Sequence, residues 1–156
     1  MRANMGWNDV NTTMCANSAR VFLLQGEGLV KYWSKQSLLF LSTYMAPCTV
    51  NLALACELYF KALLSGEHNG QAPKTHHLQE LFDELQSQTQ SEIKAEYTTF
   101  STLLSFDNCI LTHDNAFVEW RYYYEGNKNS ISGHPPSLYY LALSLNHIYS
   151  KREANP

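Results

Sequence analysis

Residues 47–65 read PCTVNLALACELYFKALLS, and this stretch decides the fold class. Its side chains are apolar on nearly every side of a helix, and Glu57 and Lys61 are its only charged residues. Several neighbouring elements must cover a helix that is apolar all round. The stretch therefore predicts the central helix of a helical bundle. This helix is expected to begin at Pro47, because proline suits the first turn of a helix.

Helical periodicity continues along the rest of the chain. One apolar face, for example, follows the spacing i, i+3, i+4, i+7 through Leu78, Leu81, Phe82 and Leu85. No segment alternates apolar and polar residues over the length of a strand, so no sheet is expected. The sequence predicts an all-α bundle whose first breaks fall at Gly26, Gly28 and Pro47. Helices are expected at 10–25, 29–44, 47–65, 76–86, 88–105, 109–125 and 136–152.

The composition is that of one folded domain. The chain has 156 residues, of which 45% are hydrophobic, so residues 1–156 are interpreted as a single domain with its own core. Charged residues make up only 16%, and the net charge is −3. These values exclude a disordered charged tail and a positive field over the whole protein. A polyanion such as RNA would need a local basic patch.

The sequence contains no pattern typical of a metal, a cofactor or a membrane span. Its four cysteines have no CxxC pairing, which argues against a zinc knuckle or a redox motif. The N-terminus lacks the apolar run of a signal peptide. Residues 36–56 are uncharged, but polar residues and Pro47 interrupt them, so we interpret them as parts of two soluble helices. We expect a cytoplasmic protein with no metal, no cofactor and no membrane partner.

Glu57 and Lys61 are the first unusual pair. At positions i and i+4 on an exposed helix face, such a pair contributes only about 0.2–0.5 kcal/mol. Here the neighbouring residues are apolar, so a carboxylate that faces inward needs a partner. The alternative is that both residues lie on a narrow solvated strip, with the ammonium group of Lys61 reaching outward.

The second unusual stretch is THDNAFVEWRYYYEG at 112–126. Arg121 follows Trp120 and precedes three tyrosines, and Glu125 lies at i+4, where the two could pair. An arginine among aromatic rings can stack on a nucleobase or hold a phosphate. The alternative is an arginine at a helix end that ties the bundle together through a buried carboxylate.

The third stretch, THHLQELFDEL at 75–85, contains two adjacent histidines. Adjacent helical residues point about 100° apart, whereas a metal site of the HExxH type needs histidines at i and i+4. Thr75 and His76 are therefore expected to help cap a helix. The sequence also lacks the motifs of dinucleotide, P-loop, serine hydrolase and kinase sites.

Taken in order, three stretches resemble the HEPN domain family. They are NLALACELYFKALL at 51–64, THHLQELFDEL at 75–85 and FVEWRYYYEG at 117–126, and the resemblance covers residues 47–152. It implies an up-and-down bundle of about five main helices that often forms homodimers. Many family members are metal-independent ribonucleases of toxin–antitoxin, abortive-infection and CRISPR-linked defence systems. Others are non-catalytic RNA-binding or assembly domains.

Catalytic members of this family carry an arginine and, after four to six intervening residues, a histidine. The histidine can act as general acid or base while the arginine stabilises the charge on the phosphate. Arg121 matches this arginine, but the places of the histidine are taken by Gly126, Asn127 and Lys128. The chain departs from the family pattern here, and we expect metal-independent RNA cleavage to be weak or absent. A displaced base would be His113, His134 or His147.

Two hypotheses of function follow. In the first, the partner is RNA or a nucleotide, and the candidate catalytic residues are Arg121 and His113. The candidate binding residues are Glu57, Lys61, Tyr122, Tyr124 and Glu125. In the second, the chain is a non-catalytic interaction module that recruits a partner protein.

Two structural expectations accompany both hypotheses. A homodimer is expected, with tyrosine-rich surfaces such as Tyr139 and Tyr140, because aromatic residues are enriched at interfaces. The family architecture places the helix of Arg121 near residues 47–65. Glu57 and Arg121 are therefore expected to form an ion pair, since a buried carboxylate and a permanent cation each need a partner.

Overall fold

The computed structural model describes residues 6–33, 38–100, 103–122 and 133–155. Its helices are α1 (Thr12–Trp33), α2 (Leu38–Glu67), α3 (Leu78–Asp83), α4 (Ser87–Phe100), α5 (Phe106–His113), α6 (Ala116–Arg121) and α7 (Pro135–Ala154). Two three-residue strands, β1 (Trp7–Asp9) and β2 (Gln71–Pro73), pair in antiparallel fashion, with Asn8 opposite Ala72. The prediction of an all-α bundle is confirmed. The small sheet is an addition that the sequence did not predict.

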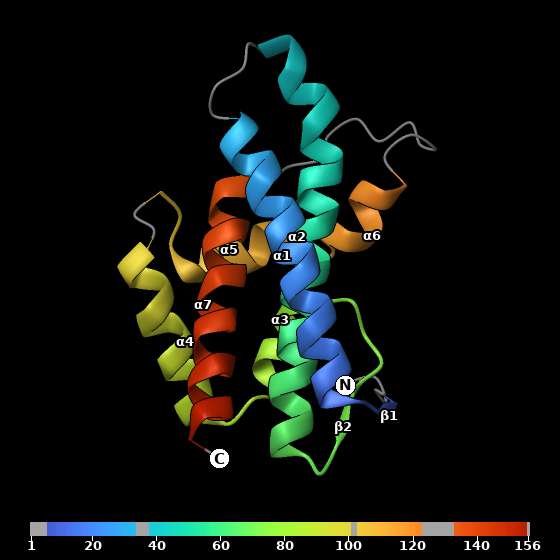
Figure 1. Ribbon diagram of the computed structural model, residues 1–156, viewed down its shortest axis with the longest axis vertical. Helices are drawn as coiled ribbons and strands as arrows, with labels where there is room; N and C mark the ends of the chain where they lie inside the picture. Colours follow the sequence, from blue (N-terminus) through green and yellow to red (C-terminus); the bar gives the residue numbers. More distant parts are fainter. Residues whose placement is uncertain (1–5, 34–37, 101–102, 123–132, 156) are drawn as a thin grey trace.

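Helix α2 is the centre of the bundle. Helices α1 and α7 lie along it, and α3, α6 and β2 pack against it (Figure 1). Its side chains Leu52, Tyr59 and Phe60 are completely buried. The predicted central helix is therefore confirmed. Helix α4 packs on α7 and lies on the opposite side of the bundle from α6 (Figure 1). Helices α4 and α6 therefore cover different faces of the bundle.

The first two helices are longer than predicted. Helix α1 passes through Gly26 and Gly28, and α2 passes through Pro47. Gly26 lies where α1 packs on α2 without room for a side chain, since a β-carbon there would be 2.4 Å from Cδ2 of Leu52. The predicted break at Gly26 and Gly28 and the predicted start at Pro47 are wrong, whereas the described parts of the predicted helices at 10–25 and 29–44 are helical from Thr12 on. Packing of α1 on α2 outweighs the weak helix propensity of glycine and proline.

The predicted helix at 109–125 is two short helices, α5 and α6, with Asp114 at their junction. Oδ1 of Asp114 accepts a hydrogen bond from the backbone N–H of Gln79 at 2.8 Å, and its main-chain carbonyl accepts one from Leu78 at 2.9 Å. Asp114 thereby satisfies the open N–H groups at the start of α3. The chain turns at this residue for that reason. Residues 123–125 of the predicted helix lie outside the described residues.

One helical stretch, Tyr44–Glu67, is long and apolar enough by length and composition to cross a membrane. In the bundle, 72% of its most apolar window is buried by the neighbouring elements. Its apolar character is accounted for by its place at the centre of the bundle. The expected cytoplasmic location stays a prediction.

Candidate functional site

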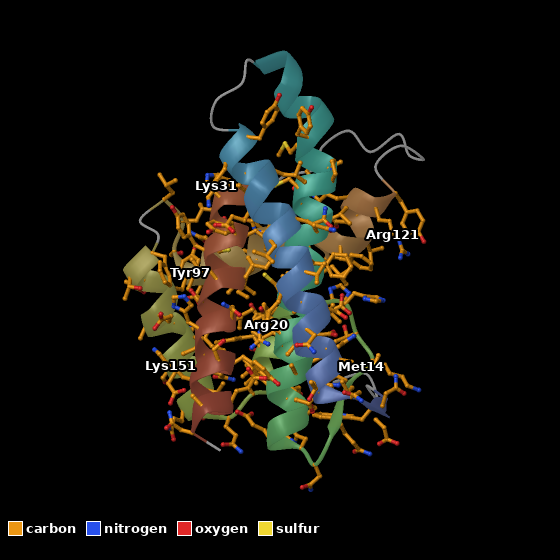
Figure 2. The ribbon with its side chains drawn as sticks, viewed as in Figure 1. Met14, Arg20, Lys31, Tyr97, Arg121 and Lys151 are labelled. Atoms are coloured by element: carbon orange, nitrogen blue, oxygen red, sulfur yellow. The ribbon has the colours of Figure 1, made fainter. Side chains whose placement is uncertain are left out.

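The three stretches that the sequence singled out meet at one place on the bundle. Glu57 and Lys61 come from α2, His76 from the segment before α3, and Phe117 and Arg121 from α6. We call these five residues the α2–α6 site. Figure 2 shows Arg121 at the edge of the molecule on α6, across the view from Lys151 on α7.

Glu57 is the buried anchor of the α2–α6 site. Only 3% of the residue is exposed, and Nζ of Lys61 donates to its Oε1 at 2.7 Å. Nδ1 of His76 lies 3.1 Å from Oε1 and 3.0 Å from Oε2. A carboxylate in apolar surroundings is tolerated when charged partners hydrogen-bond to it in this way. Glu57 therefore faces inward and has partners for its carboxylate, which is the first of the two alternatives.

The predicted ion pair between Glu57 and Arg121 is wrong. Within the described ranges, the ion-pair partners of Glu57 are Lys61 and His76. Lys61 reaches the carboxylate because it lies one helical turn further along α2. These two partners occupy both carboxylate oxygens, so Glu57 has no need of the guanidinium.

His76 is held by this carboxylate and is open to solvent. Its side chain is 52% exposed, and Nδ1 carries a hydrogen because it faces the accepting oxygens of Glu57. In the part of the chain that is described, Nε2 has no hydrogen-bond partner. A carboxylate that fixes one imidazole nitrogen orients the ring and leaves the other nitrogen for a ligand or a proton. His76 is thus a functional candidate and not the cap that the sequence suggested.

The residues around His76 hold the segment before α3 in place. The N-cap residue of α3 is His77, whose Nδ1 lies 2.8 Å from Oδ2 of Asp114. The backbone N–H of His77 also donates to Oγ1 of Thr75 at 3.1 Å, and Thr75 donates to Glu80 at 2.5 Å. Because residues on both sides are tied down, the imidazole of His76 is positioned before any ligand arrives.

Phe117 contacts both His76 and Arg121. Its ring centroid lies 5.5 Å from that of His76 and 5.0 Å from Cζ of Arg121. Arg121 also lies over the ring of Tyr122, with Cζ 4.4 Å from the centroid, and donates to the Tyr122 hydroxyl. Among the described residues, the contacts of Arg121 are with these two side chains and not with a carboxylate. A stacked guanidinium of this kind keeps donors for an anion.

Trp120 fixes the helix that carries Arg121. It is 5% exposed, and the chain passes so close to its ring at Gly133 that a β-carbon there would lie 3.1 Å from Cζ2.

Tyr124 and Glu125, two of the expected binding residues, lie outside the described residues. The expected pairing of Arg121 with Glu125 therefore stays a prediction.

His113 has a structural role, and its assignment as a candidate catalytic base is corrected. It is completely buried, its Nδ1 donates to the carbonyl of Cys109 at 2.8 Å, and its Nε2 accepts from the backbone N–H of His134 at 2.9 Å. Burial lowers the pKa of His113 to about 4, against a smaller opposing effect of the Cys109 carbonyl. A neutral imidazole with both nitrogens bonded inside the core cannot exchange a proton with a substrate.

The other histidines named as displaced bases are also engaged elsewhere. Nδ1 of His134 accepts from the backbone N–H of Ser137 at 3.1 Å and caps α7. Nδ1 of His147 lies 2.9 Å from Glu96, and this bond is the main reason why the pKa of Glu96 is lowered. Neither contacts the α2–α6 site.

A groove of about 950 Å³ lies between α4, α7 and the end of α2. Its cations are paired with acids: Arg152 lies 3.1 Å from Glu67, and Lys151 lies 3.2 Å from Glu96. Such interlocked charges leave little net field for a polyanion. Within the described ranges, no group of three or more His, Cys, Asp or Glu side chains could hold a metal ion.

Sequence reasoning missed His76 and Phe117 as members of the site. The available signal was Glu57, a lone acid on an apolar helix that needed a partner from elsewhere in the chain. Any of several cations could have met that need, and only the tertiary fold selects His76.

No protein-family model, no characterised protein and no solved structure matches this chain. The function is therefore argued from the α2–α6 site itself, and the HEPN resemblance remains an expectation.

Proposed function

We propose that the chain is an RNA-directed protein of the HEPN type, which holds the phosphate backbone of RNA or of a nucleotide at the α2–α6 site. One observation supports this most strongly. An imidazole and a guanidinium contact the same ring, at 5.5 Å and 5.0 Å from the centroid of Phe117. Both side chains are open to solvent, so each is accessible to an anion from outside.

The chemistry of these groups suits a phosphate. The planar fork of Arg121 can donate two parallel hydrogen bonds to phosphate oxygens. His76 has its Nδ1 on Glu57, and its second ring nitrogen, Nε2, is a further polar atom that a ligand can reach. Tyr122, which is 40% exposed, adds an aromatic ring beside the guanidinium, where a base can stack. Because the net charge is −3, such attraction is confined to this patch.

We expect Arg121→Ala to weaken binding of a single-stranded RNA at least tenfold, about 1.4 kcal/mol. The slope of log affinity against log salt concentration should also become shallower by about one, because one fewer counterion is released on binding. Lys151→Ala is the matched control, because it removes the same charge from α7, where Nζ is tied to Glu96. The measurement is fluorescence anisotropy of a labelled RNA at fixed ionic strength in EDTA, with circular dichroism to check folding.

The comparison of the two variants decides the location of the site. Equal weakening in Arg121→Ala and Lys151→Ala would contradict the α2–α6 site, because it would mean attraction by net charge alone. Absence of RNA binding by the unaltered chain would contradict the proposed function as a whole.

Metal-independent RNA cleavage is expected to be weak or absent. Transfer of the phosphodiester to the neighbouring 2′-oxygen needs one group to accept the hydroxyl proton and another to donate a proton to the leaving oxygen, and each such transfer contributes about 10²–10⁴-fold. At the α2–α6 site one imidazole, that of His76, contacts Phe117. The ammonium group of Lys61 is bound to Glu57. Incubation of the protein with a labelled RNA in EDTA measures this. Robust cleavage by the unaltered chain would contradict the expectation. If His76→Gln abolished this cleavage and the His113→Asn variant kept it, His76 would be assigned as the base.

The second candidate function, a non-catalytic dimeric interaction module, is favoured by a different observation. Helix α1 exposes four large apolar side chains, Met14, Val21, Leu24 and Tyr32, with exposed fractions of 66%, 53%, 65% and 46%. Scattered apolar residues are ordinary on protein surfaces, but four on one helix suggest a partner.

A further inference from the structure

Lys74 lies just outside the α2–α6 site and has no acid beside it. It stands in the segment between β2 and α3, two residues before His76, and it is exposed. The other described lysines and arginines, except Arg121, each form an ion pair with a carboxylate; these are Arg20, Lys31, Lys61, Lys94, Lys151 and Arg152. Within the described ranges, Lys74 and Arg121 are therefore the cations that are left for a ligand.

The small sheet holds the backbone of Lys74 in place. Its N–H donates to the carbonyl of Gly6 at 2.8 Å, which continues the pairing of β1 with β2 by one residue. Its aliphatic stem lies over the same glycine, since a β-carbon at Gly6 would be 3.4 Å from Cδ of Lys74. The lysine is thus anchored at its backbone, and its ammonium group extends from a fixed point on the surface.

Lys74, His76 and Arg121 follow one another along one side of the bundle. The segment that carries Lys74 and His76 runs up the outside of the bundle from β2 and turns inward below α6 (Figure 1). Two residues of chain span at most about 7 Å, which limits the distance between the Cα atoms of Lys74 and His76. Beyond His76 come the ring of Phe117, at 5.5 Å, and then Arg121, at 5.0 Å from that ring.

The acids on the neighbouring helices do not neutralise these groups. Glu80, in the first turn of α3, accepts a hydrogen bond from the hydroxyl group of Thr75, and Glu119 lies in the first turn of α6. Among the described residues, neither acid forms an ion pair with Lys74, His76 or Arg121. Two unpaired cations on either side of an exposed imidazole give a local positive field on a chain whose net charge is −3.

From this arrangement we infer that the ligand of the α2–α6 site is an oligonucleotide strand and not a free nucleotide, and that the strand continues from Arg121 past His76 to Lys74. We call these three residues the phosphate track. Arg121 and His76 hold one phosphate, as proposed above, and Lys74 holds the next one. The inference rests on the proposed function, because the track has no ligand if no phosphate binds at Arg121.

The length of the phosphate track favours a strand over a single phosphate. His76 and Phe117 separate Lys74 from Arg121, so one phosphate group cannot hydrogen-bond to both cations. Successive phosphates of an unstacked strand lie about as far apart as Cα atoms two residues apart in an extended chain. One phosphate can therefore face His76 while its neighbour faces Lys74. The base next to Arg121 can stack on the exposed ring of Tyr122.

A comparison of two ligands of different length tests the inference. We expect Lys74→Ala to weaken binding of labelled single-stranded oligoadenylate about fivefold and to make the slope of log affinity against log salt concentration shallower by about one. The same variant should leave the affinity for adenosine monophosphate unchanged, as measured by NMR titration of the His76 signal. Arg121→Ala should weaken the binding of both ligands, because it removes the phosphate contact that they share.

Two control variants accompany this comparison. Lys74→Arg keeps the charge and should bind oligoadenylate as the unaltered chain does. Lys151→Ala removes an equal charge from α7, where Nζ is tied to Glu96, and it should change neither affinity. Circular dichroism checks that each variant folds, which is expected for Lys74→Ala because the bond to Gly6 is made by the backbone.

The possible results separate this inference from the proposed function. If Lys74→Ala changes neither the affinity for oligoadenylate nor its salt slope while Arg121→Ala weakens binding, the strand path is wrong and the proposed function stands. Equal weakening of oligoadenylate and adenosine monophosphate by Lys74→Ala would also overturn the strand path, because Lys74 would then contact the same phosphate as Arg121. If neither ligand binds to the unaltered chain, the proposed function fails and the inference fails with it.

Discussion

Acidification from pH 7 to pH 4 should remove about 3 kcal/mol of stability through His113 alone. The folded protein holds this residue neutral, since burial lowers its pKa from 6.5 to about 4. In the unfolded chain His113 binds its proton near pH 6.5. Between pH 6.5 and pH 4 the unfolded state therefore holds more protons than the folded state does. The contribution is therefore complete above pH 6.5 and is lost as the pH falls through 4.

Urea unfolding across this pH range, with the unaltered chain and His113→Asn side by side, isolates this contribution. The variant keeps a side-chain donor near the Cys109 carbonyl and has no proton to bind. It should be less stable at pH 7, and its stability should fall less steeply towards pH 4. Parallel curves for the two proteins would contradict the buried neutral state of His113.

Glu57→Gln should cost about 2–3 kcal/mol. Breaking a fully buried ion pair costs ~3–5 kcal/mol, but here Lys61 and His76 keep some contact with water. Their side chains are 17% and 52% exposed, which lets the polar groups left without the carboxylate recover part of their hydration. Urea unfolding at constant pH measures the loss.

Two further variants separate this cause from a general effect of surface charge. Glu153→Gln removes an acid whose side chain is 43% exposed from its pair with Arg20, and it should cost less than about 1 kcal/mol. Adding Lys61→Met to Glu57→Gln should restore part of the stability, because the unpaired ammonium group is then absent. If Glu57→Gln and Glu153→Gln cost the same, the buried anchor of the α2–α6 site would be refuted.

The helices were predictable because their apolar faces repeat along the chain, but their ends were not. Glycine and proline mark breaks in isolated segments, but Gly26 lies inside α1 and Pro47 inside α2. The side chain of Leu52 occupies the place that a β-carbon at Gly26 would take, so the glycine is needed where α1 packs on α2. Conversely, the continuous pattern at 109–125 contains a turn because Asp114 bonds to the start of α3.

The candidate site was predictable only in its parts. The sequence singled out Glu57, Lys61 and Arg121 by their unusual neighbours, and the structure brings the stretches that contain them together. It could not show which cation meets Glu57, because that depends on how the segment before α3 is held against α2. His113 was favoured for its nearness to Arg121 in sequence, whereas burial in the core removes it from any substrate.

The most direct test of the α2–α6 site is an NMR titration that follows the imidazole signals of histidine-labelled protein as single-stranded RNA is added. His76 and His77 form an internal comparison. Both have Nδ1 on a carboxylate and an exposed ring, but His76 is the one that contacts Phe117. We predict that the His76 signal shifts with a saturating curve, that Arg121→Ala weakens this curve, and that the signals of His113 and His147 stay in place. Saturable RNA binding that moves His147 and leaves His76 unchanged would contradict the site and place the RNA on α7 instead.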